Sequence, residues 1–218
     1  MVKEYKTIYE DGAGEIVEKK SRFICHIFHV TSQEEAEAIL EKMRKKYWDA
    51  THNCYAYCIG KKQELMRCSD DGEPAQTAGR PMLDVLVGQK LCDVMAVVTR
   101  YFGGTLLGTG GLVRAYGGAV KEGLNHSVIV EKKLADLLKI TVDYTGIGKI
   151  QYLLGQEGLV PTGSEYGECV KVTVPVPVDD LERIRTAIKE GTNGKAQMEV
   201  LKQIYYGNIN GTTLLFEE

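Results

Sequence analysis

The stretch R-Y-F-G-G-T-L-L-G-T-G-G-L-V-R-A-Y-G-G, residues 100–118, decides the fold of the first half of this chain. It follows an apolar run at 94–99 that is typical of a buried strand, and it leads into apolar residues at helical spacing. We therefore predict a strand at 93–100, a glycine-rich loop, and a helix at about 110–126. The glycines that crowd this loop are Gly103, Gly104, Gly108, Gly110 and Gly111.

This loop has the features of an anion-binding site. Glycine has no Cβ, so a ligand can approach the backbone N–H groups closely. The N-terminus of the following helix adds unpaired N–H groups and a partial positive charge. Arg100 and Arg114 flank the loop, and Arg80 lies upstream; their guanidinium groups suit phosphate or carboxylate. We predict that these three arginines and the five glycines bind an anionic ligand.

Structural explanations for the same residues remain open. The glycines could permit close packing of a helix on a strand, with no ligand at all. Arg80 and Arg114 could pair with Asp70, Asp71 or Glu73 and order the polar loop that contains those carboxylates. The glycine spacing matches neither the phosphate-binding loop of nucleotide hydrolases nor a dinucleotide fingerprint, so nucleotide hydrolysis is disfavoured.

The polar loop S-D-D-G-E-P, residues 69–74, forms a possible acidic site. Asp70, Asp71 and Glu73, with His52, could bind a divalent cation or act as acid and base. Asp-Asp-Gly is equally typical of a turn, because Asp tolerates turn geometry and Gly supplies a positive φ. We favour the turn, and we predict no catalytic residue, no metal and no cofactor.

The six cysteines are expected to be reduced thiols. No secretory signal precedes them, so three disulfides are disfavoured. A zinc site formed by His52, Cys54, Cys58 and Cys68 is a possible alternative, because strand alternation places the first three on one face. Their spacing is not a known zinc pattern, and free cysteine is commonly buried. We therefore predict that they pack in the core.

Composition indicates a globular protein without a general affinity for nucleic acid. The 218 residues are 44% hydrophobic and 26% charged, with a net charge of −3. A dedicated nucleic-acid binder usually has a basic excess, so any such binding requires a local patch. No run of 18 apolar residues predicts a membrane span, and no apolar leader is present, so we expect a cytoplasmic protein.

Hydrophobic periodicity predicts two halves, with domains at 1–132 and 133–218 and a change of texture at Glu131–Lys133. In the first half, Ser32 and Glu35 form a capping box before a helix at 33–46. The other elements expected there are strands in 13–30, at 51–59 and at 64–68, and a helix begun by Pro81. Trp48 ends the helical pattern at 33–46 and is expected in the core.

The second half predicts the order β-α-β-β-α-β in about 75 residues, which is the ferredoxin-like arrangement. We expect strands around 138–142, 159–165, 168–176 and 196–206, and helices around 147–154 and after Asp179. These strands are half apolar and half polar, so helices should cover one face of the sheet. The other face remains available for a protein partner.

Three long motifs in the right order resemble the IMPACT family, in its bacterial YigZ-type two-domain form. They are D-A-T-H-N-C-Y-A-Y (49–57), S-D-D-G-E-P-A-Q-T-A-G-R-P (69–81) and V-V-T-R-Y-F-G-G-T-L-L-G-T-G-G-L-V-R-A-Y-G-G-A (97–119). The resemblance covers most of residues 15–127. It implies an α+β protein with an N-terminal domain like ribosomal protein S5 domain 2 and a C-terminal ferredoxin-like domain.

The resemblance also implies a functional class. Eukaryotic IMPACT is linked to translational control through an additional N-terminal domain that we do not expect here, so its partners are not carried over. For bacterial members, fold similarity suggests RNA or the ribosome as partner. We therefore predict a non-catalytic RNA- or ribosome-binding protein with a role in regulation of translation. The alternatives are an enzyme acting on a small phosphorylated or carboxylated substrate at the acidic loop, and a protein-interaction adaptor.

Overall fold

The computed structural model describes residues 1–217 and divides the chain into two compact units. The first unit is Tyr5–Val130, and the second unit is Glu131–Glu218 together with Met1–Glu4. The first residues belong to the second unit because the backbone N–H of Leu134 donates to the carbonyl of Lys3 at 2.7 Å. The sequence predicted a domain boundary after residue 132, and the structure divides the chain two residues earlier, after Val130.

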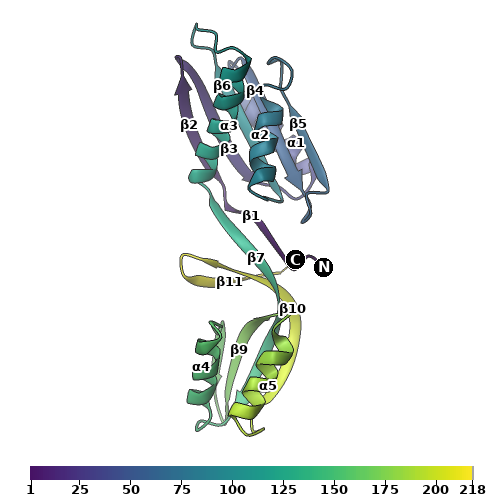
Figure 1. Cartoon of the computed structure of the whole chain (residues 1–218), viewed down its shortest axis with the longest axis vertical. Helices are drawn as coiled ribbons and strands as arrows, with labels where there is room; N and C mark the ends of the chain where they lie inside the picture. Colours follow the sequence, from purple (N-terminus) through teal and green to yellow (C-terminus); the bar gives the residue numbers. More distant parts are fainter. Residues whose placement is uncertain (218) are drawn as a thin grey trace. The chain divides into compact units, whose positions relative to one another are not determined.

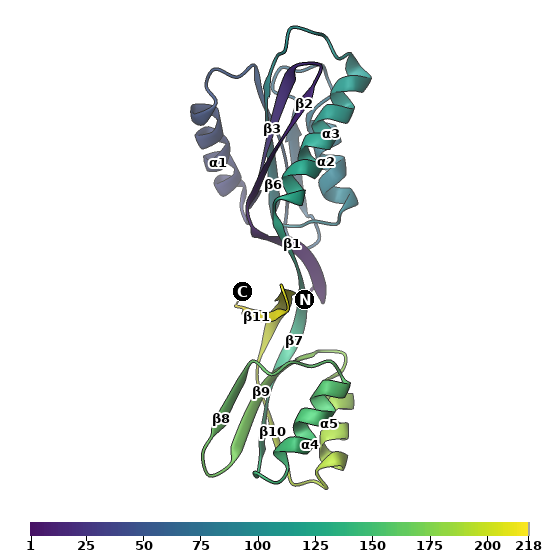
Figure 2. The ribbon, with the colours of Figure 1, turned by 90° about the vertical axis from the view of Figure 1, so that its left-hand side faces the viewer.

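The first unit contains a five-stranded antiparallel sheet with helices on both faces (Figure 1). The strand order is β2 (Gly12–Glu18), β3 (Ser21–His29), β6 (Val94–Tyr101), β4 (His52–Ile59) and β5 (Leu65–Ser69). Helix α1 (Gln33–Lys46) covers one face, and α2 (Gly79–Gly88) and α3 (Thr109–Asn125) cover the other (Figure 2). The β1 strand (Glu4–Glu10), which the sequence did not predict, precedes this sheet.

Each face of this sheet has its own apolar core, as strand alternation requires. Val94, Ala96 and Val98 of β6 pack with α2 and α3, whereas Met95 and Val97 pack toward α1. The central strand β6 is consequently buried over almost its whole length. This explains why its sequence is a continuous apolar run.

Helix α1 has the predicted bounds, with Ser32 as its N-cap residue. The Ser32 Oγ atom accepts from the backbone N–H of Glu35 at 3.2 Å. The Glu35 carboxylate accepts from the backbone N–H of Thr31 at 2.8 Å, one residue before the usual partner in a capping box. These bonds satisfy N–H groups at the start of α1.

The second unit has the predicted order β-α-β-β-α-β, followed by one strand that the sequence did not predict. The elements are β7 (Val128–Val142, which begins in the first unit), α4 (Ile147–Gln156), β8 (Gly163–Tyr166), β9 (Val170–Pro177), α5 (Leu181–Gly191), β10 (Gln197–Ile209) and β11 (Thr212–Phe216). Five strands of its sheet follow the antiparallel order β11-β10-β7-β9-β8, and β1 pairs with β7 outside this order. Without the added β11, this topology is consistent with a ferredoxin-like fold. The prediction of a two-domain α+β protein is confirmed.

Both helices of the second unit lie on one face of its sheet (Figure 2). The alternating valines of β9 at 170, 172, 174 and 176 point into that core. The segment at 131–133, where the sequence texture changes, is part of the continuous strand β7. None of the helices in residues 1–217 combines the length and hydropathy that crossing a membrane requires.

Candidate functional site

The glycine loop joins β6 to α3 and packs tightly on the turn between β2 and β3. The backbone N–H of Gly103 donates to Ser21 Oγ at 3.1 Å. A Cβ atom on Gly103 would lie only 2.0 Å from the carbonyl carbon of Lys20. Gly103 is therefore required for close backbone packing, which is the structural explanation for this glycine.

The remaining loop glycines set the entry into α3. Gly104 and Gly108 have φ values of +80° and +74°, in the region that favours glycine. Gly108 is the N-cap residue of α3, and no side chain caps the helix there. A Cβ on Gly111 would lie 2.9 Å from Leu107 Cβ, whereas one on Gly110 would meet only Arg114, at 3.7 Å. The first turn of α3 thus presents backbone N–H groups with no side-chain acceptor.

Arg114 is the predicted arginine that stays available for a ligand. It is exposed, and its Nη1 atom lies near Gly110 in the first turn of α3. It forms no ion pair within residues 1–217, so the expected alternative of a pair with Asp70, Asp71 or Glu73 does not occur in this structure. The guanidinium group and the helix N-terminus place positive charge at one end of α3.

Arg100 occupies a different environment from the other two arginines. Its Nη1 atom lies 2.5 Å from Glu73 Oε1, and both side chains are buried. The guanidinium group lies over the rings of Phe23 and Phe102, 5.4 and 5.6 Å from their centroids. Arg100 therefore connects the acidic loop, through Glu73, to the glycine loop, through Phe102, in the interior of the first unit.

Arg80 lies on the exposed surface of α2. Its Nε atom lies 2.8 Å from Asp84 Oδ1, one helical turn later. Within the described part of the chain, no hydrogen bond or ion pair joins Arg80 to the glycine loop. The structure does not bring the three arginines together as one cluster.

The carboxylates of the acidic loop accept hydrogen bonds from the backbone at Asp70 and Asp71 and from side chains at Glu73. Asp70 Oδ1 accepts from the N–H groups of Ala78 and Gly79 at 2.9 and 2.8 Å, and so caps α2. Asp71 Oδ2 accepts from the N–H of Asn53 at 2.7 Å. The third carboxylate, Glu73, accepts from the hydroxyl of Tyr116 at 2.8 Å. These bonds give all three carboxylates a structural role.

His52 lies beside this loop. Its Nδ1 atom is 2.8 Å from the carbonyl oxygen of Asp71, and its Nε2 atom is 3.9 Å from Glu73 Oε1. Within residues 1–217, no group of three or more His, Cys, Asp and Glu residues has the geometry to hold a metal ion. The four predicted acidic-site residues are thus neighbours, held together by structural contacts.

Cys54 and Cys58 lie in the core between the sheet and helices α2 and α3. The thiol of Cys54 donates to the carbonyl of Asp70 at 3.0 Å, and burial raises its pKa. Cys68 is exposed on the edge strand β5. Packing in the core therefore accounts for Cys54 and Cys58 and not for Cys68.

The prediction that Trp48 is buried was wrong, since 83% of its surface is exposed. The helix ends at Lys46, and its C-cap residue Tyr47 takes the covered position instead. The Tyr47 hydroxyl and His26 Nε2 are 2.8 Å apart. Helical spacing up to Tyr47 gave no information about the residue that follows it.

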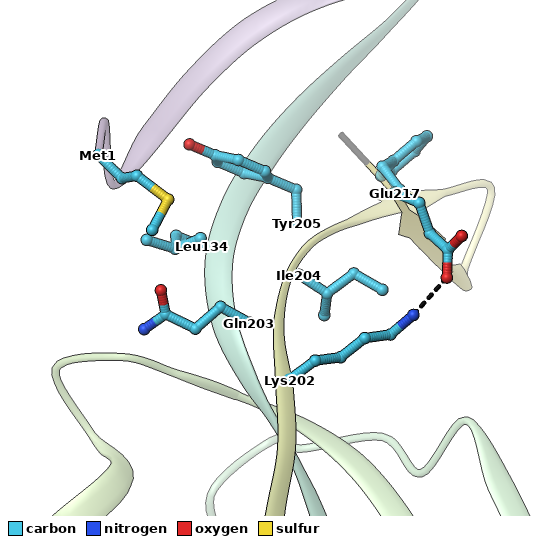
Figure 3. A pocket seen from close by; sticks show the side chains of 8 residues that line it. Met1, Leu134, Lys202, Gln203, Ile204, Tyr205 and Glu217 are labelled. Carbon is cyan, nitrogen blue, oxygen red and sulfur yellow. Dashed lines mark hydrogen bonds and ion pairs between the residues drawn. The ribbon is translucent and has the colours of Figure 1, made fainter.

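The second unit has a pocket of about 350 Å³ that the sequence analysis missed (Figure 3). It lies where the first residues of the chain meet β10 and β11. Its apolar lining is Met1, Leu134, Ile204, Tyr205 and Phe216. Lys202 and Glu217 form an ion pair beside it, and the Tyr205 hydroxyl donates to the carbonyl of Val2 at 2.6 Å. No local motif marks this pocket because distant segments build it.

The helix-free face of the second sheet is polar rather than apolar. Lys139 pairs with Glu199 at 3.3 Å, and Lys171 pairs with Glu165 at 3.8 Å. Thr141 of β7 lies on the same face, opposite Lys171 of β9. The face predicted to dock a protein partner thus carries opposite charges that neutralise one another.

Together these features define a class of proteins with two α+β units, each built on an antiparallel sheet, in which the first unit carries a glycine-rich loop before a helix. Residues 19–124 match the model of the Impact N-terminal domain, and residues 140–195 match a domain of unknown function, DUF1949. The chain belongs to the IMPACT family.

The similarity to two bacterial relatives covers most of each chain. The IMPACT family member YvyE of Bacillus subtilis is 45% identical over 91% of this chain and 92% of its own. The IMPACT family member YigZ of Escherichia coli is 36% identical over 85% of this chain and 92% of its own. A crystal structure of a hypothetical protein has 34% identity and a TM-score of 0.58, covering 93% of this chain and 99% of that one.

Proposed function

We propose that this protein is a non-catalytic cytoplasmic regulator of translation that binds the phosphate backbone of RNA, on the ribosome or free. The observation that carries the proposal is the first turn of α3 beside the guanidinium group of Arg114. Within residues 1–217 no side chain caps this turn, and Arg114 forms no ion pair. Backbone N–H groups and a dipole end that favour anions meet there with a forked cationic donor. Membership of the IMPACT family supports the link to translation.

The surroundings of this end of α3 suit a nucleic acid. Phe102 is 49% exposed and Leu106 is 82% exposed, and both lie in the loop that precedes α3. An exposed aromatic ring beside a phosphate site can stack on a base without sequence preference. Because the net charge of the protein is −3, binding depends on this local patch.

Arg100 has a supporting role in this proposal. Its buried pair with Glu73 fastens the loop that carries Phe102, so it holds the site in shape without touching RNA. Arg80 lies on α2 with its own partner and is not part of the proposed site. The site therefore consists of Arg114, the loop from Phe102 to Gly108, and the first turn of α3.

The test is binding of a fluorescein-labelled single-stranded RNA, followed by anisotropy as the salt concentration is raised. We expect affinity to fall as salt rises, because phosphate contacts release counterions. Arg114→Ala should weaken binding across sequences and reduce the salt slope, whereas Arg185→Ala removes the same charge from the second unit and should change neither. Absence of binding to RNA and to purified ribosomal subunits at low salt would contradict the proposal.

A further inference from the structure

The turn between β2 and β3 is a two-residue hairpin loop formed by Lys19 and Lys20. The flanking residues Glu18 and Ser21 pair with each other, so only these two lysines make the turn. Their φ values are +43° and +67°, and two consecutive positive values are those of a type I′ turn. Asn-Gly is the favoured sequence for this turn, and lysine is poorly suited to either position.

Both lysines are exposed, and neither forms an ion pair within residues 1–217. The nearby basic residue Arg22 is already paired with Glu15, 2.7 Å from its Nε atom. The hairpin thus places two unpaired positive charges at its tip, in a backbone conformation that lysine disfavours. Non-glycine residues in this region are often found where function requires them.

The hairpin tip lies against the glycine loop. Gly103 packs directly on the backbone of Lys20, and its N–H donates to Ser21. The figures show the tip of the β2–β3 hairpin and the loop between β6 and α3 at the same end of the first unit (Figures 1 and 2). The lysines and the loop therefore share one surface.

The packing of β2 on α3 places the tip level with the helix N-terminus. Gly14 lies against Glu122, and Ile16 lies against Gly118. Two residues along a strand and four along a helix both advance the chain by about 6 Å, so this spacing repeats. Extrapolated by one further step, this spacing puts the end of β2 level with Arg114 and the turn level with the first turn of α3.

We propose that the Lys19–Lys20 turn is a second phosphate contact of the RNA interface. The inference rests on the proposed function and names a partner chemistry for this surface, a phosphodiester backbone that runs from the α3 N-terminus across the hairpin tip. Lysine suits this task because its ammonium group is a mobile point charge that tolerates variable phosphate positions. Charge complementarity favours RNA over a neutral or basic partner.

The test replaces the turn with its favoured sequence, Lys19→Asn with Lys20→Gly. This variant keeps the type I′ backbone, so we expect the urea midpoint of unfolding to stay the same or rise. Affinity for a fluorescein-labelled oligouridylate should fall several-fold at low salt. The slope of log affinity against log salt should shrink by about 1.4, because each lost contact on single-stranded RNA accounts for about 0.7.

The matched control is Lys61→Gln with Lys62→Gln. It removes the same charge from the loop after β4, at the opposite end of the sheet, and should leave the salt slope unchanged. An equal loss of affinity in this control would overturn the inference, since the effect would then reflect net charge alone.

Failure of this inference is distinguishable from failure of the proposed function. If the wild-type protein binds oligouridylate and the Asn-Gly variant binds with the same affinity and slope, the turn is not a contact. If the wild-type protein does not bind RNA at all, both the proposed function and the inference fail. A third outcome comes from competition. If polyglutamate displaces the labelled RNA as effectively as unlabelled RNA does, the surface binds acidic protein segments, and the inference is also overturned.

Discussion

The guanidinium group of Arg100 and the carboxylate of Glu73 form a buried ion pair, with 2.5 Å between Nη1 and Oε1 and exposed side-chain fractions of 7% and 3%. Arg100 is the penultimate residue of β6, which leads into the glycine loop, and Glu73 belongs to the acidic loop 27 residues earlier. The Tyr116 hydroxyl of α3 donates to the same Glu73 oxygen. One carboxylate therefore holds together two motifs that look independent in the sequence.

Removing one partner of this pair should be costly. We expect Arg100→Met to lower the free energy of unfolding by about 3–5 kcal/mol, because Glu73 is left charged and buried without its cation. Urea denaturation followed by circular dichroism measures this loss. Arg80→Ala breaks an exposed pair and should cost no more than about 0.5 kcal/mol. Similar losses in the two variants would show that the Arg100 pair is not structural.

Gly103→Ala should destabilise the first unit, whereas Gly155→Ala should not. A Cβ on Gly103 would meet the Lys20 backbone at 2.0 Å, and backbone atoms cannot rotate away. Gly155 lies in α4, and a Cβ added there would meet nothing within 4 Å, so alanine should stabilise the helix by about 0.5–1 kcal/mol. The thermal unfolding midpoints of the two variants, each compared with that of the wild-type protein, measure this difference. A stable Gly103→Ala protein would contradict the observed packing of the loop.

The thiols should react with Ellman's reagent in two classes. Cys68 is exposed and Cys169 is half-buried, so both should react in the folded protein. Cys25, Cys54, Cys58 and Cys92 are buried, and burial raises the pKa of each thiol, so these four should react only on unfolding. Counting released thiolate with and without urea tests this, and Cys68→Ser should remove the faster phase. Full reaction of all six thiols in the native protein would be the contrary result.

Stability should decline at alkaline pH. Burial raises the pKa of Cys58 to about 12 in the folded protein and also raises the pKa of Cys25. In the unfolded chain these thiols ionise near pH 8.5, so above that pH the unfolded state loses protons first and is favoured. The stabilisation is complete below about pH 8.5 and is lost as pH rises toward 12.

The urea midpoint measured from pH 8 to pH 11 checks this prediction. A Cys25→Ala variant, compared at each pH, should show a shallower decline because one of the buried thiols is gone. A midpoint that does not change over this range would mean that these thiols are not protected in the folded state.

Local patterns were sufficient for most of the elements. The capping residues Ser32 and Glu35 and the following apolar spacing predicted α1 correctly, because both signals act within one helical turn. The alternating valines of β9 likewise predicted a strand with one buried face. Strands β1 and β11 were missed. Strand β1 pairs with β7, more than 100 residues away, whereas β11 forms a hairpin with the preceding strand β10 through Asn210 and Gly211.

The candidate site was only partly predictable. The glycine spacing correctly located a tight loop before α3, because positive φ and close approach are backbone demands that glycine meets. The partners of the arginines were not predictable, since charge says nothing about burial. Only the fold shows that Arg100 faces inward to Glu73 while Arg114 remains unpaired at the helix end.

By itself, the sequence determined most of the elements and their order, the two-domain α+β class and the family, because these depend on periodicity, caps and contiguous motifs. The tertiary structure alone decided which charges are internal and which are presented together. The turn at Lys19–Lys20 and the loop at Gly103 are more than 80 residues apart in the chain and meet only because β3 and β6 pair in the sheet. Non-local pairing of this kind leaves no signature in either segment.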